Sequence, residues 1–335
     1  MSLVTINLNL GVELTMLDVG QGDSVVIRNN NGNVYISDCG SSSVSKIGKY
    51  RLIPFLKYKG YGKIKGIFIS HLDEDHINGI LELLEMAPEE RIEISYLFLP
   101  ESVLGIEEDK ELVEKLERLA KENKTKLIFL KQGDRIKDDF MEFLCLYPDS
   151  DEKQNGLKKN RNNQSLVLFM IYKDFEMLFT GDIEKEGEKE IVEYIERMRI
   201  QNEQKVPDER DEVDYYGKQN GYSEEKKKQN EIWNNYSEEE KKQNETWNHK
   251  RIMQCDVLKV AHHGSSGSSS EIFLETINPK LSLISCGKNN SYGHPHEETL
   301  ERLELVGSKI MSTADSGAIT LELKRRKIKI GRYRH

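Results

Sequence analysis

The chain has 335 residues, of which 37% are hydrophobic, and a formal net charge of -9, so it can bury a sizeable core and lacks the composition of a disordered protein. No run approaches the ~20 apolar residues of a membrane-spanning helix and the N-terminus lacks a signal peptide's charged head, so we expect a cytoplasmic protein with no membrane contact. The four cysteines form no CxxC pair and are expected to be reduced and buried.

Residues 12–38 are typical of three short antiparallel strands. The apolar runs VELTMLDV, SVVIR and NVYISD are separated by GQGD and NNNGN, which favour turns. Residues 46–61 have helical spacing, interrupted by Pro54. A short apolar strand, GIFIS, and a helix, INGILELLEM, then enclose the polar motif HLDEDH, which we expect on a strand-to-helix loop.

Strands and a helix alternate between residues 94 and 130, which predicts a βαβ arrangement. The segments MEFLCLYP, SLVLFMIYK and FEMLFTGD predict consecutive strands, followed by a charged amphipathic helix over 184–200. DVLKV, LSLIS, KIMS and AITLEL repeat the strand-then-polar-loop pattern. Strands from both halves with helices alongside predict an α/β protein built as an αββα sandwich.

Residues 201–250 differ in composition from the rest of the chain. They are rich in charged residues, Gln and Asn, and contain the repeat YSEEKKKQNEIWNN, YSEEEKKQNETWNH. We expect a solvated, charged helical insertion in one domain made of residues 1–200 and 251–335. The alternative is a lid or protein-partner surface formed by an aromatic stripe of Tyr222, Trp233, Tyr236 and Trp247.

The motif HLDEDH places two imidazoles and several carboxylates on one loop. Its candidate metal ligands are His71, Asp73, Asp75 and His76. Such side chains repel one another without cations, whereas divalent metal ions satisfy all of them. The alternative is a polar helix N-terminus capped by Asp75, but capping needs one such side chain.

Three later segments add candidate residues at strand ends. Asp182 ends FEMLFTGD, and the tandem histidines His262 and His263 follow DVLKV. The polar segment YGHPH contains His294. This histidine could donate to a phosphate oxygen or a leaving group, or it could cap the following helix.

The order of these motifs resembles the metallo-β-lactamase superfamily, whose HxHxDH signature is similar to HLDEDH with Asp73 in place of the second histidine. More narrowly, it resembles the hydrolase domain of the ComEC competence family. The segments shared in order are LDVGQGDS, ISDCG, ISHLDEDHINGI, NNQSLVLFM, LFTGDI, LKVAHHGS, SYGHP and DSGAITLEL. The resemblance covers nearly the whole chain except the insertion, and implies a sandwich of the metallo-β-lactamase type.

The resemblance also implies a centre of two divalent ions, Mn²⁺, Mg²⁺ or Zn²⁺. The expected metal ligands are His71, Asp73, Asp75, His76, Asp182 and His263, with Asp182 bridging the ions. The expected catalytic residues are Asp75, His262 and His294. The expected supporting residues are Asp38, Asn162 and Asn163. No histidine lies between His76 and His249, so the superfamily's third-motif histidine is missing, and the oxygen-rich remainder favours manganese or magnesium over zinc.

The expected function is a metal-dependent phosphodiesterase or nuclease that cleaves DNA with a metal-activated hydroxide. Residues 41–70 contain no acidic residue, and their lysines alternate with tyrosines, so Lys49, Lys57 and Tyr58 are expected to bind the DNA strand. The alternative for this segment is an ordinary helix whose lysines face water. Other possible functions are hydrolysis of a small phosphodiester or lactone, or a non-catalytic binding scaffold.

Overall fold

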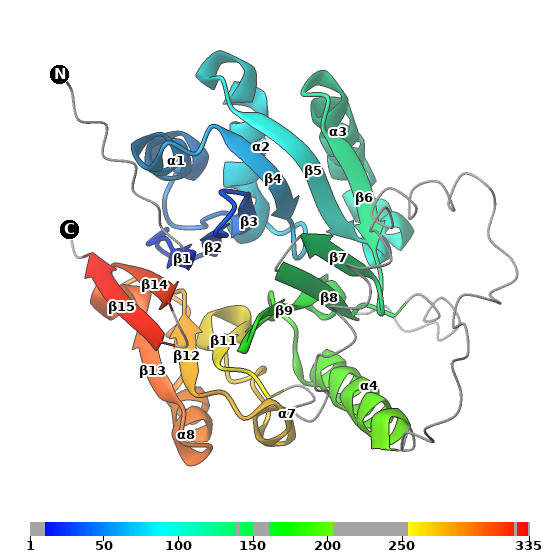
Figure 1. The fold of residues 1–335 in the computed structure, drawn as a ribbon, viewed down its shortest axis with the longest axis vertical. Helices are drawn as coiled ribbons and strands as arrows, with labels where there is room; N and C mark the ends of the chain where they lie inside the picture. Colours follow the sequence, from blue (N-terminus) through cyan, green and yellow to red (C-terminus); the bar gives the residue numbers. More distant parts are fainter. Residues whose placement is uncertain (1–10, 139–140, 150–160, 204–253, 325–326, 334–335) are drawn as a thin grey trace, which may run out of the picture.

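The structure is a computed structural model that describes residues 11–138, 141–149, 161–203, 254–324 and 327–333. Two β-sheets stack face to face, and helices cover the outer face of each sheet (Figure 1). The predicted αββα sandwich is therefore confirmed. Residues 204–253, with most of the predicted insertion and its Tyr/Trp repeat, lie outside the described residues.

The first sheet combines strands from both ends of the chain. Its strands are β1 (Val12–Met16), β2 (Ser24–Arg28), β3 (Val34–Cys39), β4 (Lys63–Phe68), β5 (Glu93–Pro100), β6 (Lys126–Leu130), β14 (Ala318–Lys324) and β15 (Lys327–Tyr333). They lie in the order β15-β14-β1-β2-β3-β4-β5-β6. Pairing is antiparallel from β15 to β3 and parallel from β3 to β6, in agreement with the predicted antiparallel start and βαβ pattern.

The second sheet has seven strands. They are β7 (Arg135–Asp138), β8 (Met141–Tyr147), β9 (Val167–Tyr172), β10 (Phe175–Phe179), β11 (Val257–Lys259), β12 (Leu281–Ile284) and β13 (Lys309–Ser312), in the order β13-β12-β11-β10-β9-β8-β7. Strands β7 to β10 pair antiparallel, and β10 to β13 pair parallel.

Helices complete the two outer layers. They are α1 (Ile53–Lys59), which continues a π-helical turn (Gly48–Leu52), α2 (Glu74–Glu90), α3 (Lys110–Glu122), α4 (Lys185–Glu203), α7 (Glu271–Ile277), α8 (Glu297–Leu305) and α9 (Thr313–Ser316). Helices α1, α2 and α3 pack on the first sheet, and α4, α7 and α8 on the second. None of the described helices is long and apolar enough to cross a membrane.

The space between the sheets is filled by a core that includes stacked aromatic rings. The Phe68 ring centroid lies 4.8 Å from those of both Phe98 and Phe143, which come from different sheets. All four cysteines are buried and unpaired, as predicted. Since each sheet is covered on both faces, its central strands are largely buried, and polar side chains collect in the loops beyond the carboxyl ends of the parallel strands.

Candidate metal centre

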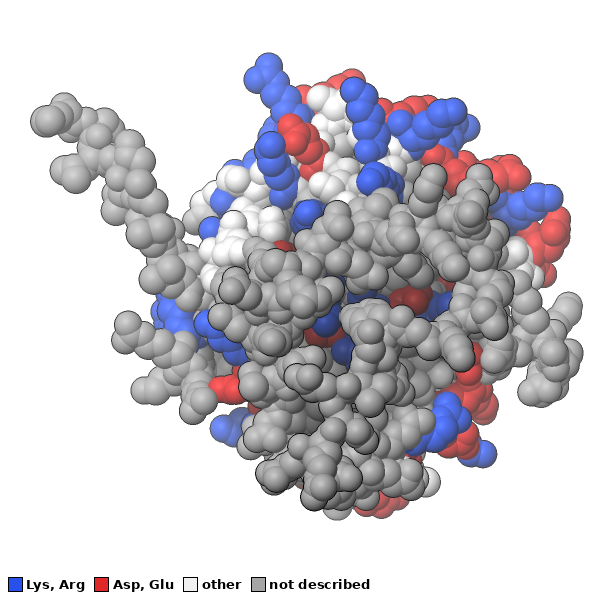
Figure 2. Space-filling view, turned by 45° about the vertical axis from the view of Figure 1, so that its right-hand side comes forward, with Lys and Arg blue, Asp and Glu red and all other residues white. Residues whose placement is uncertain are grey.

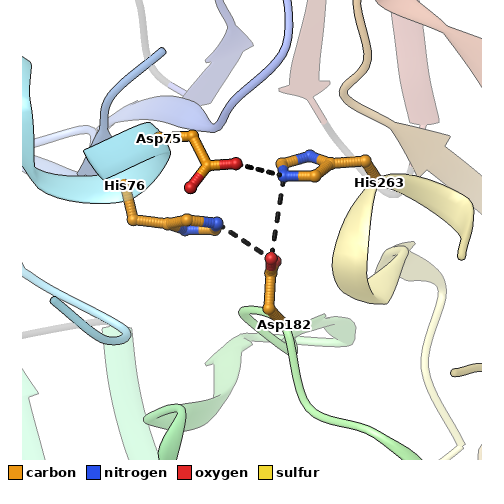
Figure 3. A group of neighbouring side chains, drawn as sticks. All are labelled: Asp75, His76, Asp182 and His263. Atoms are coloured by element: carbon orange, nitrogen blue, oxygen red, sulfur yellow. Dashed lines mark hydrogen bonds and ion pairs between the residues drawn. The ribbon is translucent and has the colours of Figure 1, made fainter. Parts of the chain in front are cut away.

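Three loops bring four candidate ligands together at one edge of the sandwich. Asp75 and His76 lie in the first turn of α2, Asp182 follows β10, and His263 follows β11 (Figure 3). One ligand atom from each of these four residues lies within 4.8 Å of the others. His76 Nε2 is 3.1 Å from Asp182 Oδ1, and His263 Nε2 is 3.3 Å from Asp75 Oδ2. This metal-ligand cluster joins two carboxylates and two imidazoles.

In both imidazoles of the cluster, Nδ1 contacts a group outside the cluster. His263 Nδ1 donates to the Ser285 carbonyl at 2.8 Å, and His76 Nδ1 lies 3.2 Å from Asp38 Oδ2. A proton held on Nδ1 leaves the Nε2 lone pair free to bind a cation inside the cluster. Asp38 thus contacts the ligand loop, where it was expected to provide support.

The cluster stabilises ionised carboxylates. Burial alone would raise the pKa of Asp75, but His263 and His76 bring it down to about 2. Burial is likewise outweighed at Asp182, where His76 and His263 hold the pKa well below its usual value. At His76, burial would lower the pKa, yet Asp182 raises it. Positive charge beside them therefore stabilises these carboxylates, and a divalent ion bound here would supply it in place of the histidine protons.

The backbone is strained at three of the candidate residues. Asp38, His262 and His263 have φ values of 55°, 49° and 54°, in the left-handed region that residues with a Cβ rarely adopt. Such conformations cost about 1–3 kcal/mol each and concentrate at functional sites. Gly181, before Asp182, has φ 53°, and a Cβ there would lie 2.8 Å from the Cβ atoms of Ser70 and Ser165.

His71 lies beside the cluster, with its ring centroid 4.1 Å from that of His76. Burial is the main cause that lowers the pKa of His71, to about 4, so its ring is neutral at pH 7. Its Nδ1 lies 3.0 Å from Ser70 Oγ, while Nε2 is buried without a hydrogen-bond partner among the described residues. A neutral imidazole with a free, buried nitrogen is suited to binding a metal ion.

Asp73 is engaged by an arginine that the sequence did not single out. Arg161 Nη1 donates to Asp73 Oδ1 at 3.0 Å, and its other terminal nitrogen pairs with the buried Asp109. Asp73 Oδ2 lies 3.7 Å from His71 Nε2. Asp73, not Asp75, is the N-cap residue of α2, and its side chain makes no capping bond, so the capping interpretation of this motif is wrong.

The two candidate asparagines brace the loop that carries Asp182. Asn163 Oδ1 accepts a hydrogen bond from the backbone of Glu184 at 2.9 Å, and Asn162 Nδ2 donates to the Glu184 carboxylate at 2.9 Å. Ser165 Oγ accepts from the Asp182 backbone N–H at 3.0 Å. These contacts hold the loop that carries Asp182 in place.

A buried ion pair behind the cluster was not predicted. Lys259 Nζ pairs with Asp23, and both residues are almost completely buried. Asp23 Oδ2 lies 3.6 Å from His76 Nδ1, and Asp23 Oδ1 lies 3.7 Å from His263 Nδ1. Burial would lower the pKa of Lys259, but Asp23 and Asp182 raise it, so the ammonium stays charged. The Asp23 carboxylate of this pair thus lies beside the Nδ1 atoms of both cluster histidines.

His262 and His294 lie at the rim of the cluster. Their ring centroids are 5.6 Å apart, and His262 Nε2 lies 3.9 Å from Asp182 Oδ2. Gln21 Oε1 accepts from the Gly287 backbone, which turns Gln21 Nε2 toward His294 Nδ1 at 3.3 Å. Burial, then the neighbouring histidines, lower the pKa of His294 to about 4. The N-cap residue of α8 is His296, so His294 does not cap that helix.

The predicted DNA-binding residues lie away from this cluster. Lys57 pairs with Glu90 at the far end of α2, roughly 20 Å along the helix from its first turn. Tyr58 is 86% exposed beside it, and the Lys49 ammonium lies 5.5 Å from the Tyr50 ring. Figure 2 shows basic side chains interspersed with acidic ones at the top of the view. Contact of Lys49, Lys57 and Tyr58 with DNA therefore stays a prediction.

The stacked sheets and the polar loops at their shared edge define a protein of the metallo-β-lactamase fold. A family model described as the metallo-beta-lactamase superfamily matches residues 17–95. The fold and the metal-ligand cluster together support a metal-dependent hydrolase. YhfI from Bacillus subtilis, a metallo-beta-lactamase fold protein, aligns with a TM-score of 0.47 and 10% identity over 96% of this chain and all of that one.

The particular relatives are competence proteins, which confirms the resemblance to the ComEC family. ComE operon protein 3 from Bacillus subtilis (strain 168) is 28% identical over 327 residues, 94% of this chain and 33% of that protein. Competence protein ComA from Neisseria gonorrhoeae is 26% identical over 321 residues, 96% of this chain and 34% of that protein. The chain spans about a third of the length of these relatives.

Proposed function

We propose that this protein is a divalent-metal-dependent phosphodiesterase that cleaves DNA. The observation that carries the metal dependence is the buried cluster of Asp75, His76, Asp182 and His263, with ligand atoms within 4.8 Å of one another. The choice of DNA is supported by the similarity to competence proteins over nearly the whole chain. Because the chain spans a third of those proteins, their activity is a proposal for this one.

The ligands divide into two sets. Asp75, His76 and His263 would hold one ion, His71 and Asp73 would hold the other, and the Asp182 carboxylate would be available to both. The oxygen-rich set suits Mn²⁺ or Mg²⁺ as well as Zn²⁺. When bound, two such ions acidify water for attack on phosphorus and neutralise charge on the phosphodiester oxygens.

The two rim histidines would contact the substrate. Because Gln21 donates to His294 Nδ1, the His294 proton lies on Nε2, where it can donate to a non-bridging phosphate oxygen. Because its pKa is low, the His294 ring is neutral and is better suited to donating a hydrogen bond than to acting as a general acid. His294 would therefore orient the phosphate. His262, with Nδ1 3.6 Å from Glu184 Oε1, is better placed to pass a proton to the leaving group.

Metal binding should occur in two unequal steps, because Arg161 occupies one oxygen of Asp73. A second ion would have to compete with this guanidinium, whereas no arginine or lysine among the described residues forms an ion pair with Asp75 or Asp182. Calorimetric titration with Mn²⁺ should show one tighter and one weaker site, and Arg161→Met should strengthen the weaker site by about tenfold, or ~1.4 kcal/mol. Arg199→Met, which removes an arginine from α4, serves as a control; equal weakening of both sites in Arg161→Met would contradict competition.

The direct test is cleavage by the purified full chain. Loaded with Mn²⁺, Mg²⁺ or Zn²⁺, the protein should cut single- or double-stranded DNA and stop in EDTA. Bis-(p-nitrophenyl) phosphate is assayed in parallel under the same conditions. Hydrolysis of this diester with both forms of DNA intact would contradict DNA as substrate and favour a small phosphodiester. Absence of both bound metal and turnover would favour a binding scaffold.

A further inference from the structure

An exposed aromatic ring lies next to the rim histidines. Tyr292, in the loop between β12 and α8, is 57% exposed, and one face of its ring stacks on His294. The two ring centroids are 5.6 Å apart with an interplanar angle of 22°. The His294 ring centroid in turn lies 6.2 Å from that of His263, a member of the metal-ligand cluster, so a single ring separates Tyr292 from the cluster.

The loop that presents these rings is held rigidly by Asn290. The Asn290 Oδ1 atom accepts from the backbone N–H groups of Tyr292 and His294, at 3.1 and 3.0 Å. Its Nδ2 donates to the carbonyls of Gly287 and His294, at 2.9 and 2.6 Å. One side chain therefore ties both ring-bearing residues to the end of β12.

His296 braces the same loop against the loop that follows the tandem histidines. Its Nδ1 accepts from the Ser266 backbone at 2.9 Å, so the ring proton lies on Nε2 and is donated to the Tyr292 carbonyl at 3.1 Å. The Tyr292 backbone is thus held from two sides, although its ring is exposed. Exposed aromatic rings on a braced backbone lose little entropy on binding.

From this arrangement we infer that Tyr292 and His294 form a stacking platform for one base of a single-stranded DNA substrate. The inference rests on the proposed function and specifies its substrate. A phosphodiester over the metal-ligand cluster would place a neighbouring base within reach of Tyr292. Every base has a flat face, so such stacking tolerates any sequence. A base paired in a duplex cannot offer that face, so single strands should be preferred.

The experiment uses oligo(dT) substrates, one intact and others with a single abasic site moved one nucleotide at a time. Cleavage is measured with wild type, Tyr292→Ala and Tyr292→Phe, each checked by its thermal unfolding midpoint. Tyr292→Ala should raise KM for the intact strand about tenfold to a hundredfold, while Tyr292→Phe keeps most of the stacking. When the abasic site removes the base that stacks on Tyr292, the wild type and Tyr292→Ala should have the same KM.

Three results would overturn the platform while leaving DNA cleavage intact. The first is an unchanged KM in Tyr292→Ala. The second is a KM that Tyr292→Ala raises equally on every abasic substrate, which would indicate a structural defect. The third is a KM that is raised in Tyr58→Ala and not in Tyr292→Ala, which would place the strand along α1. A different result would contradict the proposed function itself. In that case the wild type would hydrolyse the small diester and leave oligo(dT) uncut, and the stacking platform would be contradicted as well.

Discussion

Asp182→Ala should abolish metal-dependent hydrolysis. The Asp182 carboxylate faces His76 Nε2 at 3.1 Å and His263 Nε2 at 3.7 Å, so it is the group that the cluster shares. We expect kcat to fall by about three orders of magnitude or more, equivalent to ~4 kcal/mol of activation free energy. Bound metal, measured by mass spectrometry after gel filtration, should fall in parallel, since the remaining ligands lose their central carboxylate.

Two further variants make this result specific. Asp182→Asn keeps the side-chain shape and removes the charge, so it should lose metal almost as fully as Asp182→Ala. Glu93→Ala removes an exposed carboxylate that pairs with Lys63, 3.2 Å away at the start of β4, and should keep activity within about twofold. Wild-type turnover in Asp182→Ala would exclude this cluster as the reaction centre.

The strands were predictable where both sheet faces are covered. SVVIR coincides with β2, because an apolar run bounded by polar loops is typical of a buried strand. KLIFL coincides with β6, although this strand lies at an edge of its sheet and is only partly buried. Strands β7 and β15 were not predicted. β7 has one apolar residue in four, and β15 alternates lysine with isoleucine as an edge strand that, among the described strands, pairs with β14 alone.

The candidate ligands were predictable for a related reason: each lies in the loop or the first helical turn that follows a strand. Their partners were not, since pairing depends on which loops meet in three dimensions. Arg161 reaches Asp73 across 88 positions of sequence, and Lys259 reaches Asp23 across a larger separation. The signal for Lys259 was present, because a lysine inside the apolar strand DVLKV is rarely buried without an acidic partner.

The basic segment shows what composition alone leaves open. Its lysines and tyrosines, without any acidic residue among them, are compatible both with a DNA-binding surface and with an ordinary helix whose lysines face water. In the fold, acidic residues from elsewhere in the chain reach it: Glu13 pairs with Lys59, and Glu90 pairs with Lys57. A run of like charges in sequence thus need not give a charged surface, because neighbours in space come from other elements.

Lys259→Met should destabilise the protein more than other lysine substitutions. It would leave the Asp23 carboxylate buried beside His76 and His263 without its ammonium partner, and would remove the bond from Lys259 Nζ to the Gly181 carbonyl, 3.2 Å away. Removing one partner of a buried pair costs about 3–5 kcal/mol. The free energy of unfolding, from urea denaturation in EDTA, should fall by this amount.

The matched control is Lys280→Met, because Lys280 pairs with Asp256 at 2.6 Å but is largely exposed. That pair should contribute at most ~1 kcal/mol, since solvent screens it. Adding Asp23→Asn to Lys259→Met should recover part of the lost stability, because a neutral amide is less costly to bury than an unpaired carboxylate. If Lys259→Met and Lys280→Met lost equal stability, Lys259 would not act as the counterion of Asp23.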